Sequence, residues 1–366
     1  MKLFQPDNFS SAAIKFAKLN KNNKFSFCGI LDLYFKKYSI LSIEQLVGTE
    51  INSNNYKVRV LISGRQKTFL LRKFLFLQGK NNIDFYLNLM LLLKKKKVAI
   101  SEPIKSLEGG LFVANKNNYY ALFSFIQGSH FLPAKVNYLA VAKEVGNLHK
   151  VLGSLDKKNI EKIKKLSQAN KNIYYNRIKI YSVKDLERIE QKIEKIKNQN
   201  KTIKIIKQEL PFLKNTIQEV SCYLPQLKKL PKSIIHSDLH PHNLLINNQK
   251  VAAILDFDSM RESERVRDVA VAMYRLGRQF LIKKNFKEVK IKKEASNLKD
   301  IFLKKYCTIN HLSKKEIELM PIVLKDEFIR KMLVVLKGVF EENHFAWEKD
   351  IVKFIMALKE VKYFWN

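Results

Sequence analysis

Residues 234–258 constrain the fold and the chemistry of this chain more than any other stretch. They contain His236 and Asp238 separated by one residue, then Asn243 five residues after that aspartate, and then Asp256 after a short apolar segment. An imidazole, two carboxylates and an amide at fixed spacing within one short stretch are typical of a catalytic loop rather than of a solvated surface.

Two short apolar runs between Asn243 and Asp256 predict a tight β-hairpin. The first run covers residues 244–246, and the second returns over residues 251–255. The asparagine pair 247–248 between them tolerates the left-handed backbone of a two-residue turn. A hairpin of this length brings Asp256 back beside Asn243, so two oxygen-bearing side chains converge.

The spacing from Asp238 to Asn243, with a later aspartate, is that of the catalytic loop of kinases. Phosphoryl transfer needs a positioned hydroxyl, a positioned ATP and cations over the phosphates. Asp238 can accept the proton of an attacking hydroxyl, while Asn243 and Asp256 offer hard oxygen ligands to Mg²⁺. The spacing therefore predicts a phosphotransferase site with Asp238 as its catalytic base.

Two other interpretations of this stretch are open. The first is that short motifs of this kind are chance surface residues. The second is a metal site made by His236, His240 and His242, but zinc sites need a further Cys or His at ligand spacing, which the sequence lacks. We favour the phosphotransferase interpretation over both, because all its residues occur in the required order.

The composition bounds the class of protein. The chain has 366 residues, enough for roughly two domains, and 46% of them are hydrophobic, which supports a sizeable core. No apolar run approaches the roughly 20 residues that span a bilayer, and the N-terminus lacks the apolar region of a signal peptide. Cys28, Cys222 and Cys307 are few and widely spaced, which indicates a reducing compartment. We therefore expect a cytoplasmic protein with no membrane partner.

The formal net charge of +34 comes from 68 Lys and Arg against 34 Asp and Glu. One interpretation is a polyanionic partner such as nucleic acid. The other is a lysine-rich composition that gives solvated cationic faces. The lysines are spread along the chain together with Asn and Ile, and no nucleic-acid-binding motif is present, so we favour the second interpretation and expect no nucleic-acid partner.

The N-terminal part of the chain predicts an extension followed by a sheet. Residues 1–38 are expected to be an extension with two helices, over residues 11–19 and 30–38. From residue 39 a period-two alternation predicts three strands. A polar loop over residues 48–55 separates the first two strands, and its single Gly48 stands where kinases have a glycine-rich phosphate loop. The strands are expected over residues 42–47, 56–62 and 68–75.

Arg72 in the third strand takes the place of the lysine that pairs with the ATP phosphates in kinases, while Lys73 points to the other face. A guanidinium can hold a phosphate bidentately. The alternative for Arg72 is an exposed edge cation. The helix that follows, over residues 84–95, contains no Glu to pair with Arg72, and Asp84 at its start is the one acidic candidate.

The remaining pattern predicts two more strands and then a mainly helical region. The strands cover residues 111–114 and 119–126, and in a kinase-like layout Ser124, Phe125 and Ile126 would form the hinge whose backbone binds adenine. Asp268 lies in the first turn of a helix, where its carboxylate can accept hydrogen bonds from the amides of a neighbouring loop. Helices are expected over residues 136–152, a Lys-rich region at 155–230, and residues 265–281, 315–340 and 347–364.

The string His236-Ser237-Asp238-Leu239-His240-Pro241-His242-Asn243, followed by Ile254-Leu255-Asp256-Phe257-Asp258 and Asp268-Val269-Ala270, resembles the aminoglycoside phosphotransferase/choline kinase-like superfamily. That superfamily commonly reads H-G-D-L-H-P-x-N, then I-D-F-x, then D-x-A. Ser237 replaces the usual glycine. Segments of the N-terminal half are most similar to the homoserine kinase type II branch.

The resemblance implies an α+β, two-lobed protein-kinase-like fold. A small antiparallel-sheet N-lobe would cover residues 39–125, and a larger, mainly helical C-lobe residues 126–366, with a helical insertion at about 155–230 and the catalytic loop at 234–258. It implies ATP and Mg²⁺ as cofactors, with Asp238 as the base and Asn243 and Asp256 on the metals. His236 would brace the loop, and Asp258 would lie near the metals or the substrate.

We therefore predict a phosphotransferase that transfers the γ-phosphate of ATP to a hydroxyl of a small molecule, in the first place an amino alcohol such as homoserine. An aminoglycoside or choline-type kinase is the alternative, although the positive net charge disfavours a polycationic acceptor. The alternative of another class is a non-catalytic nucleotide-binding or nucleic-acid-binding basic protein. The presence of the base and both metal ligands argues against a non-catalytic protein.

Overall fold

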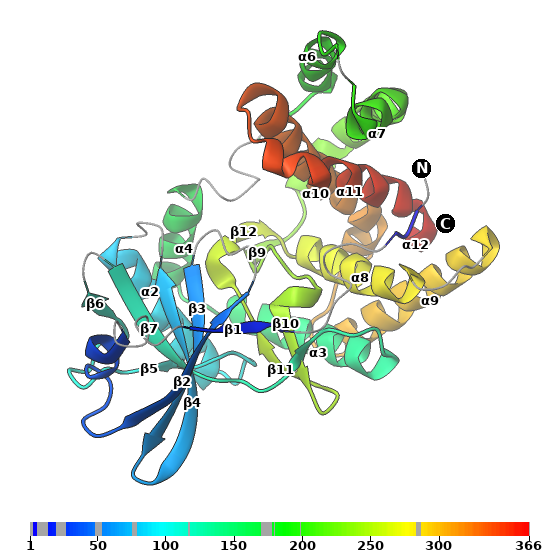
Figure 1. Cartoon of the computed structure of the whole chain (residues 1–366). Coiled ribbons are helices and arrows are strands. Elements are labelled where there is room, and N and C mark those ends of the chain that lie inside the picture. Colours follow the sequence, from blue (N-terminus) through cyan, green and yellow to red (C-terminus); the bar gives the residue numbers. More distant parts are fainter. Residues whose placement is uncertain are drawn as a thin grey trace. The chain divides into compact units, whose positions relative to one another are not determined.

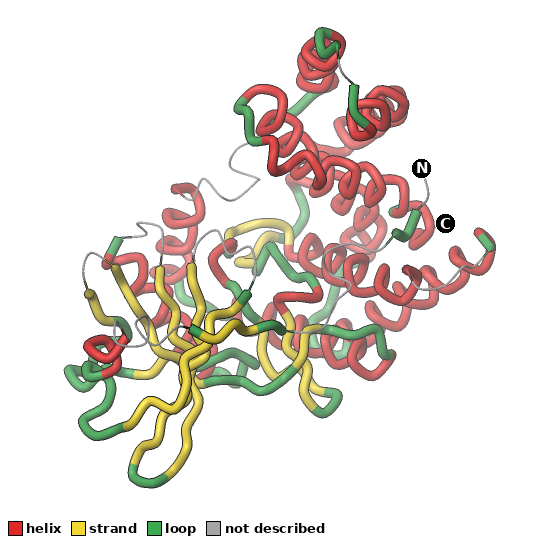
Figure 2. The backbone as a smooth tube through the Cα atoms, viewed as in Figure 1, coloured by secondary structure: helices red, strands yellow, loops and turns green. Residues whose placement is uncertain are grey.

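The structure is a computed structural model, and its chain divides into two compact units. The helical unit comprises Met1–Ser10, Leu132–Pro241 and Asp256–Asn366, and the sheet unit comprises Ser11–Phe131 and His242–Leu255. Helices dominate the first and strands the second (Figure 2). The structure describes residues 3–5, 14–19, 27–47, 53–74, 79–115, 118–169, 178, 180–197, 199–282 and 287–365.

The sheet unit is built on an antiparallel sheet of seven described strands in the order β1-β2-β3-β4-β7-β5, with β6 pairing β7 (Figure 1). One face buries Val58, Val60, Leu71 and Leu122 against side chains from the helical turn at residues 27–31. The strands are β1 (Phe16–Lys18), β2 (Ser39–Leu46), β3 (Ser53–Ile62), β4 (Arg65–Phe74), β5 (Pro103–Ile104), β6 (Val113–Asn115) and β7 (Asn118–Ser124), and helix α2 (Lys80–Lys95) follows β4.

Of the two helices predicted near the N-terminus, the first is wrong and the second is shorter and displaced. Residues 16–18 form strand β1, whose Phe16 pairs with Leu46, because the exposed edge of β2 offers the segment a hydrogen-bonding partner that the sequence pattern does not reveal. The second helix covers residues 27–31 instead of 30–38, and the chain turns before β2. The polar residues 53–55, expected in a loop, belong to β3, where Asn55 pairs with Arg72; residues 48–52 lie outside the described residues.

The hairpin predicted between Asn243 and Asp256 is present in the sheet unit. Strand β10 (Leu244–Asn247) pairs with β11 (Lys250–Ile254), and β8 (Ser129–His130) pairs with the other edge of β10. The left-handed turn residues are Asn248 and Gln249, one position later than predicted. Both have positive φ, as a two-residue hairpin turn of this type requires.

In the helical unit, α10 is the central element, because α6, α7, α8 and α11 all pack against it (Figure 1). The short strands β9 (Lys232–Ile235) and β12 (Arg261–Glu264) pair with each other and pack against α8. The helices are α3 (Lys135–Leu152), α4 (Lys157–Ala169), α6 (Val183–Glu194), α7 (Lys201–Lys228), α8 (Arg265–Ile282), α9 (Glu288–Cys307), α10 (Lys314–Glu341), α11 (Glu348–Glu360) and α12 (Lys362–Trp365).

The two chain ends meet in the helical unit. The Phe4 amide donates a hydrogen bond of 2.6 Å to Glu360, whose carboxylate also binds Arg278 at 2.7 Å, and the Phe4 ring lies 5.5 Å from that of Tyr363. Of the described residues before β2, residues 3–5 therefore belong to the helical unit, and residues 14–19 and 27–38 belong to the sheet unit. No described helix combines the length and the hydropathy that a bilayer crossing requires.

Candidate active site

The predicted catalytic loop begins in the helical unit, directly after β9. His236 is fully buried, and its ring lies 4.7 Å from that of Phe257. Its Nδ1 accepts a hydrogen bond of 3.3 Å from the Asp238 amide. The imidazole thus fixes the backbone of the loop from inside.

Asp268 holds the same loop from the first turn of α8. Its carboxylate accepts hydrogen bonds from the amides of His236 at 2.7 Å and Ser237 at 2.8 Å, and His149 Nε2 lies 3.2 Å from it. A carboxylate only accepts, so Nε2 carries the proton and Nδ1 accepts from the Tyr306 hydroxyl at 2.9 Å. Burial raises the pKa of Tyr306, which keeps that hydroxyl protonated.

His149 and Tyr306 were not predicted as site residues. Both are almost completely buried, on α3 and α9. The one signal in the sequence was His149, a polar residue on the apolar face of the helix at 135–152. A single histidine on such a face does not indicate which distant residues it binds.

The Asp238 carboxylate is 39% exposed and pairs with His240 Nε2 at 3.3 Å. Burial alone would raise the pKa of Asp238, but His240, Lys331 and His236 outweigh it and hold that pKa below its ordinary value. Burial also lowers the pKa of His240, against the pull of Asp238. At neutral pH the pair is therefore an ionised carboxylate that accepts a hydrogen bond from a neutral imidazole.

Ser237, between His236 and Asp238, has φ = 71°. The left-handed region favours glycine and costs other residues roughly 1 kcal/mol. The Ser237 hydroxyl is buried and makes no hydrogen bond to any described residue. Ser237 thus adopts a backbone conformation that a glycine would adopt with less strain.

Asn243 lies in the sheet unit, at the end of a short 3₁₀ turn (Pro241–Asn243) and just before β10. It is 8% exposed, and its carbonyl accepts a hydrogen bond of 2.9 Å from the Leu255 amide. The Ile254 amide bonds the Ala99 carbonyl at 2.7 Å, which anchors the returning strand. The hairpin therefore returns the chain to Asn243 one residue before Asp256.

Asp256 opens the part of the chain that returns to the helical unit. It is exposed and left-handed, with φ = 60° and ψ = 73°. Asp258 is half-buried in the 3₁₀ turn that follows (Phe257–Ser259). The buried Phe257 between them packs against His236, so this contact joins the turn to the predicted catalytic loop.

Arg72 lies on β4 between Asn55 of β3 and Ala121 of β7. It is half-buried, and its guanidinium lies 5.4 Å from the ring centroid of Phe74. Helix α2 begins at Lys80, so Asp84 stands inside the helix rather than at its start. Asp84 is exposed and forms no ion pair with any described residue, so it does not supply the missing partner.

The hinge residues differ in how their backbones are used. The Ser124 amide donates to the Glu102 carbonyl at 2.9 Å, and the Ser124 carbonyl accepts from the Ser101 hydroxyl at 2.5 Å. Strand β7 ends at Ser124, two residues earlier than predicted, and the backbone of Ile126 forms no hydrogen bond with a described residue. Gly128 follows, where a Cβ would lie 2.9 Å from the Ile246 carbonyl oxygen.

A buried charge network supports β12 and α8 behind the loop. Arg267, 2% exposed, contacts Glu264 at 3.0 Å, Asp326 at 2.8 Å and Glu327 at 3.2 Å. The same carboxylates also bind Arg261, Arg330 and Lys331. The network joins β12, α8 and α10 through groups that are mostly shielded from water, so each charge depends on its partners.

We predict acid sensitivity for this network. Burial alone would raise the pKa of Glu264, but Arg267 and the Ser263 hydroxyl outweigh burial and lower it from 4.5 to about 2. The ionised form is therefore favoured in the folded state, and its contribution of about 3 kcal/mol is complete above the ordinary pKa and is lost as the pH falls toward 2.

Urea unfolding of the protein and of Glu264→Gln at several pH values measures this effect. The stability difference between them should be constant above about pH 5 and shrink from there to about pH 3. Glu318→Gln, at an exposed site on α10, should show no such change. A difference for Glu264→Gln that stays constant over this range would contradict the prediction.

The three imidazoles of the alternative metal site are engaged separately. His236 packs on Phe257 and His240 pairs with Asp238, while His242 stacks on His130 at 4.7 Å in the sheet unit. Among the described residues, no group of three His, Cys, Asp or Glu side chains is arranged to hold a metal ion.

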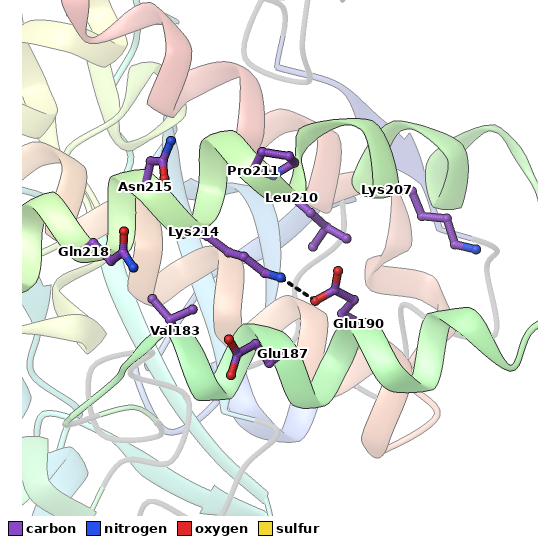
Figure 3. A pocket seen from close by; sticks show the side chains of 9 residues that line it. All are labelled: Val183, Glu187, Glu190, Lys207, Leu210, Pro211, Lys214, Asn215 and Gln218. Atoms are coloured by element: carbon purple, nitrogen blue, oxygen red, sulfur yellow. Dashed lines mark ion pairs between the residues drawn. The ribbon is translucent and has the colours of Figure 1, made fainter.

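A hollow of about 440 Å³ lies between α6 and α7 of the helical unit (Figure 3). Glu187 and Glu190 of α6 lie along it, and the ion pair between Lys214 and Glu190, 2.7 Å long, spans the two helices. Its lining contains none of the predicted site residues, so it is separate from the candidate active site.

An antiparallel sheet unit, a mainly helical unit and an H-x-D loop braced by a buried aspartate define a kinase-like phosphotransferase fold. The chain belongs to the phosphotransferase enzyme family, whose model matches residues 47–283. It is thus an enzyme of the phosphotransferase class, and the predicted α+β, two-lobed kinase-like fold is confirmed.

Solved structures with the same fold cover almost the whole chain. A spectinomycin phosphotransferase, in complex with ADP and spectinomycin, is 16% identical with a TM-score of 0.65, over 93% of this chain and 97% of that one. An ethanolamine kinase of Plasmodium vivax is 14% identical with a TM-score of 0.57, over 94% and 89%. A microcompartment-associated aminopropanol kinase is 13% identical with a TM-score of 0.56, over 93% and 95%. A comparison with curated protein sequences finds no match.

Proposed function

We propose that this protein transfers the γ-phosphoryl group of ATP, with Mg²⁺, to the hydroxyl of a small molecule. The observation that carries the proposal is the hydrogen bond from the Leu255 amide to the Asn243 carbonyl, because it returns the chain to Asn243 just before Asp256. The ADP of the similar spectinomycin phosphotransferase structure supports a nucleotide ligand.

Asp238 is the general base of the proposed reaction. Its lowered pKa keeps the carboxylate ionised at neutral pH, and the hydrogen bond from His240 orients it. The amide bonds to Asp268 hold the loop so that the carboxylate meets the acceptor hydroxyl without rearrangement. His236, Asp268 and the half-buried Asp258 act as supporting residues.

The donor set suits Mg²⁺, which prefers hard oxygen ligands. Asn243 contributes an amide oxygen and Asp256 an exposed carboxylate. When bound, the metal neutralises charge that develops on the phosphoryl oxygens. On the sheet unit, Arg72 is proposed to pair with phosphate. The Ile126 amide is available for adenine, whereas Ser124 keeps only one lone pair of its carbonyl for that role.

An amino alcohol such as homoserine is the first acceptor we propose. Two of the similar structures are kinases named for amino alcohols, ethanolamine and aminopropanol, which supports that class. The spectinomycin phosphotransferase supports an aminoglycoside as the second candidate. An ATP-consumption screen over amino alcohols, sugars and aminoglycosides tests the proposal, and a chain that consumes ATP with none of them would contradict it.

Asp256→Ala is expected to abolish Mg²⁺-dependent nucleotide binding, because the amide of Asn243 alone carries no charge to hold the cation. Calorimetric titration with an ATP analogue, with and without Mg²⁺, measures this. Asp300→Ala, an aspartate 67% exposed on α9, is the matched control and should bind normally. Normal affinity of Asp256→Ala would remove Asp256 from the site.

A further inference from the structure

The two faces of the sheet in the sheet unit differ in character. Tyr56 and Val58 of β3 are part of the hydrophobic core that covers one face. Lys57 lies between them in the sequence, so its side chain points to the other face. Asn55, two residues earlier on the same strand, shares that face and pairs with Arg72 of β4. Lys57 is therefore on the face that carries the cation proposed to pair with phosphate.

Two phenylalanine rings meet at Lys57 on this face. Phe16 of β1 and Phe125, the residue that follows β7, have ring centroids 6.4 Å apart and ring planes inclined at 54°. Lys57 Nζ lies 5.4 Å from the Phe16 centroid and 4.8 Å from the Phe125 centroid, within cation–π range of both. We call Phe16, Lys57 and Phe125 the aromatic cluster. All three residues are half-buried, so the cluster is partly open to water.

The charge of Lys57 is not neutralised by a carboxylate of the described residues. Glu44 lies directly opposite Lys57 on β2, but its carboxylate binds Arg59 at 2.6 Å instead. The ammonium group therefore rests on the two ring faces. Two rings and one cation without a carboxylate suit a flat aromatic ligand that carries negative charge at one end.

The aromatic cluster lies beside the backbone that we propose for adenine. Phe125 directly precedes Ile126, whose amide forms no hydrogen bond with a described residue. A base that accepts a hydrogen bond from this amide lies one residue from the Phe125 ring. Successive residues on one face of a strand are about 7 Å apart, so the row of Lys57 is also next to the row of Arg72. The base and the phosphates of one nucleotide therefore fit along this face.

Phe16 belongs to a part of the chain that the family does not define. The phosphotransferase enzyme family model matches residues 47–283, which include Lys57 and Phe125 but not Phe16. Strand β1 positions Phe16 by pairing it with Leu46 at the end of β2. Two roles are open to this ring. Covering the edge of the sheet requires an apolar side chain of any shape, whereas binding a base requires an aromatic plane.

We propose that Phe16 and Phe125 bind the purine base of the nucleotide by stacking, with Lys57 at the rim of the base, so that β1 completes the base site of the sheet unit. This inference rests on the proposed function. It assigns base recognition in part to an N-terminal segment that lies before the family-matched residues. The contribution of Phe16 depends on the π-face of the base and is independent of the phosphates.

Titration of the full-length protein with Mg²⁺-ADP, with adenosine and with Mg²⁺-tripolyphosphate separates the base from the phosphates. Phe16→Ala should raise the Kd for ADP and for adenosine about tenfold, the effect of one lost stacking contact, and leave the Kd for tripolyphosphate unchanged. Phe16→Tyr keeps the ring and should bind ADP like the wild type. Phe16→Leu keeps an apolar side chain without a ring plane and should bind ADP as weakly as Phe16→Ala.

Phe112→Ala is the matched control, because it removes another half-buried ring of the sheet unit, one that packs edge-on against Tyr119 at 5.5 Å. It should change none of these Kd values. Wild-type ADP affinity in Phe16→Leu overturns the inference and leaves Phe16 as a cover of the sheet edge. Equal weakening of ADP and tripolyphosphate overturns it too, as does tighter ADP binding by Phe16→Ala, because the ring would then obstruct the site.

These outcomes leave the proposed function in place as long as the wild-type protein binds ADP. A wild-type protein that binds neither ADP nor tripolyphosphate overturns the proposed function together with the inference. Where Phe16→Ala does not fold, the comparison of Phe16→Leu with Phe16→Tyr provides the test, since both retain a large apolar side chain at this position.

Discussion

Replacing Asp238 with Asn is expected to lower turnover by roughly 10²–10⁴-fold while nucleotide affinity is retained. The amide is nearly isosteric and still accepts a hydrogen bond from His240, but it cannot take the proton of an acceptor hydroxyl. The Asp238 amide, which donates to His236, is unaffected by the side-chain change. The loop should therefore keep its shape and lose only the base.

Steady-state kinetics with the acceptor found in the ATP-consumption screen, together with titration of an ATP analogue, measure the two halves of this expectation. Asp350→Asn on α11, whose carboxylate is 29% exposed and 3.6 Å from Lys353, is the control and should turn over normally. If Asp238→Asn turns over at the wild-type rate, Asp238 is not the base, and the proposed mechanism has to be abandoned.

The hairpin between Asn243 and Asp256 was predictable because its determinants are local. Two apolar runs of strand length and a turn that tolerates left-handed residues specify it within a dozen positions. The turn begins one residue later because Asn247 pairs with Lys250 and so belongs to the first strand. The hairpin also has a register shift between Leu245 and Ile246, which no alternation pattern records. The residue types and spacing of His236, Asp238 and His240 are also local, so the sequence alone could nominate this loop as the candidate site, and its catalytic role stays a prediction.

The residues that support the loop were not predictable, since their partners are far apart in sequence. His149 and Tyr306 are separated by 157 positions and meet only because α3 and α9 pack together. Strand β1 was missed for a related reason. A three-residue segment has too weak an intrinsic preference to decide its state, and pairing with β2 decides it instead.

From composition, the positive net charge was interpreted as solvated lysines on the surface. The described residues show that some cations are exposed and others are shielded beside carboxylates, which composition cannot distinguish. Lysines such as Lys314, 93% exposed, are indeed surface groups. Arg267 is buried and Lys331 is mostly shielded beside carboxylates, and Lys331 lowers the pKa of Asp238. Only tertiary structure separates these two populations, because both have the same sequence signature.

Removal of the central cation of the buried network should be the most damaging single change to stability. In Arg267→Met, Glu264, Asp326 and Glu327 lose the guanidinium that all three contact, at distances of 2.8–3.2 Å. A buried carboxylate that loses its partner must either stay ionised without compensation or take up a proton. Breaking a buried ion pair in this way costs about 3–5 kcal/mol. Methionine keeps the length and the apolar packing of the arginine stem, so the loss reports the charge rather than a cavity.

The midpoint of urea unfolding measures the loss, and Arg188→Met provides the matched control. Arg188 also contacts two carboxylates, Asp185 at 3.4 Å and Glu341 at 2.9 Å, but its side chain is 50% exposed. Water screens and replaces such a pair, so its removal should cost about 0–1 kcal/mol. Equal shifts for the two variants would mean that the network behind the loop is no more than a set of surface ion pairs. A larger shift for Arg267→Met, joined by a loss of turnover, would show that the network stabilises the catalytic loop as well as the fold, because β12 and α8 connect the two.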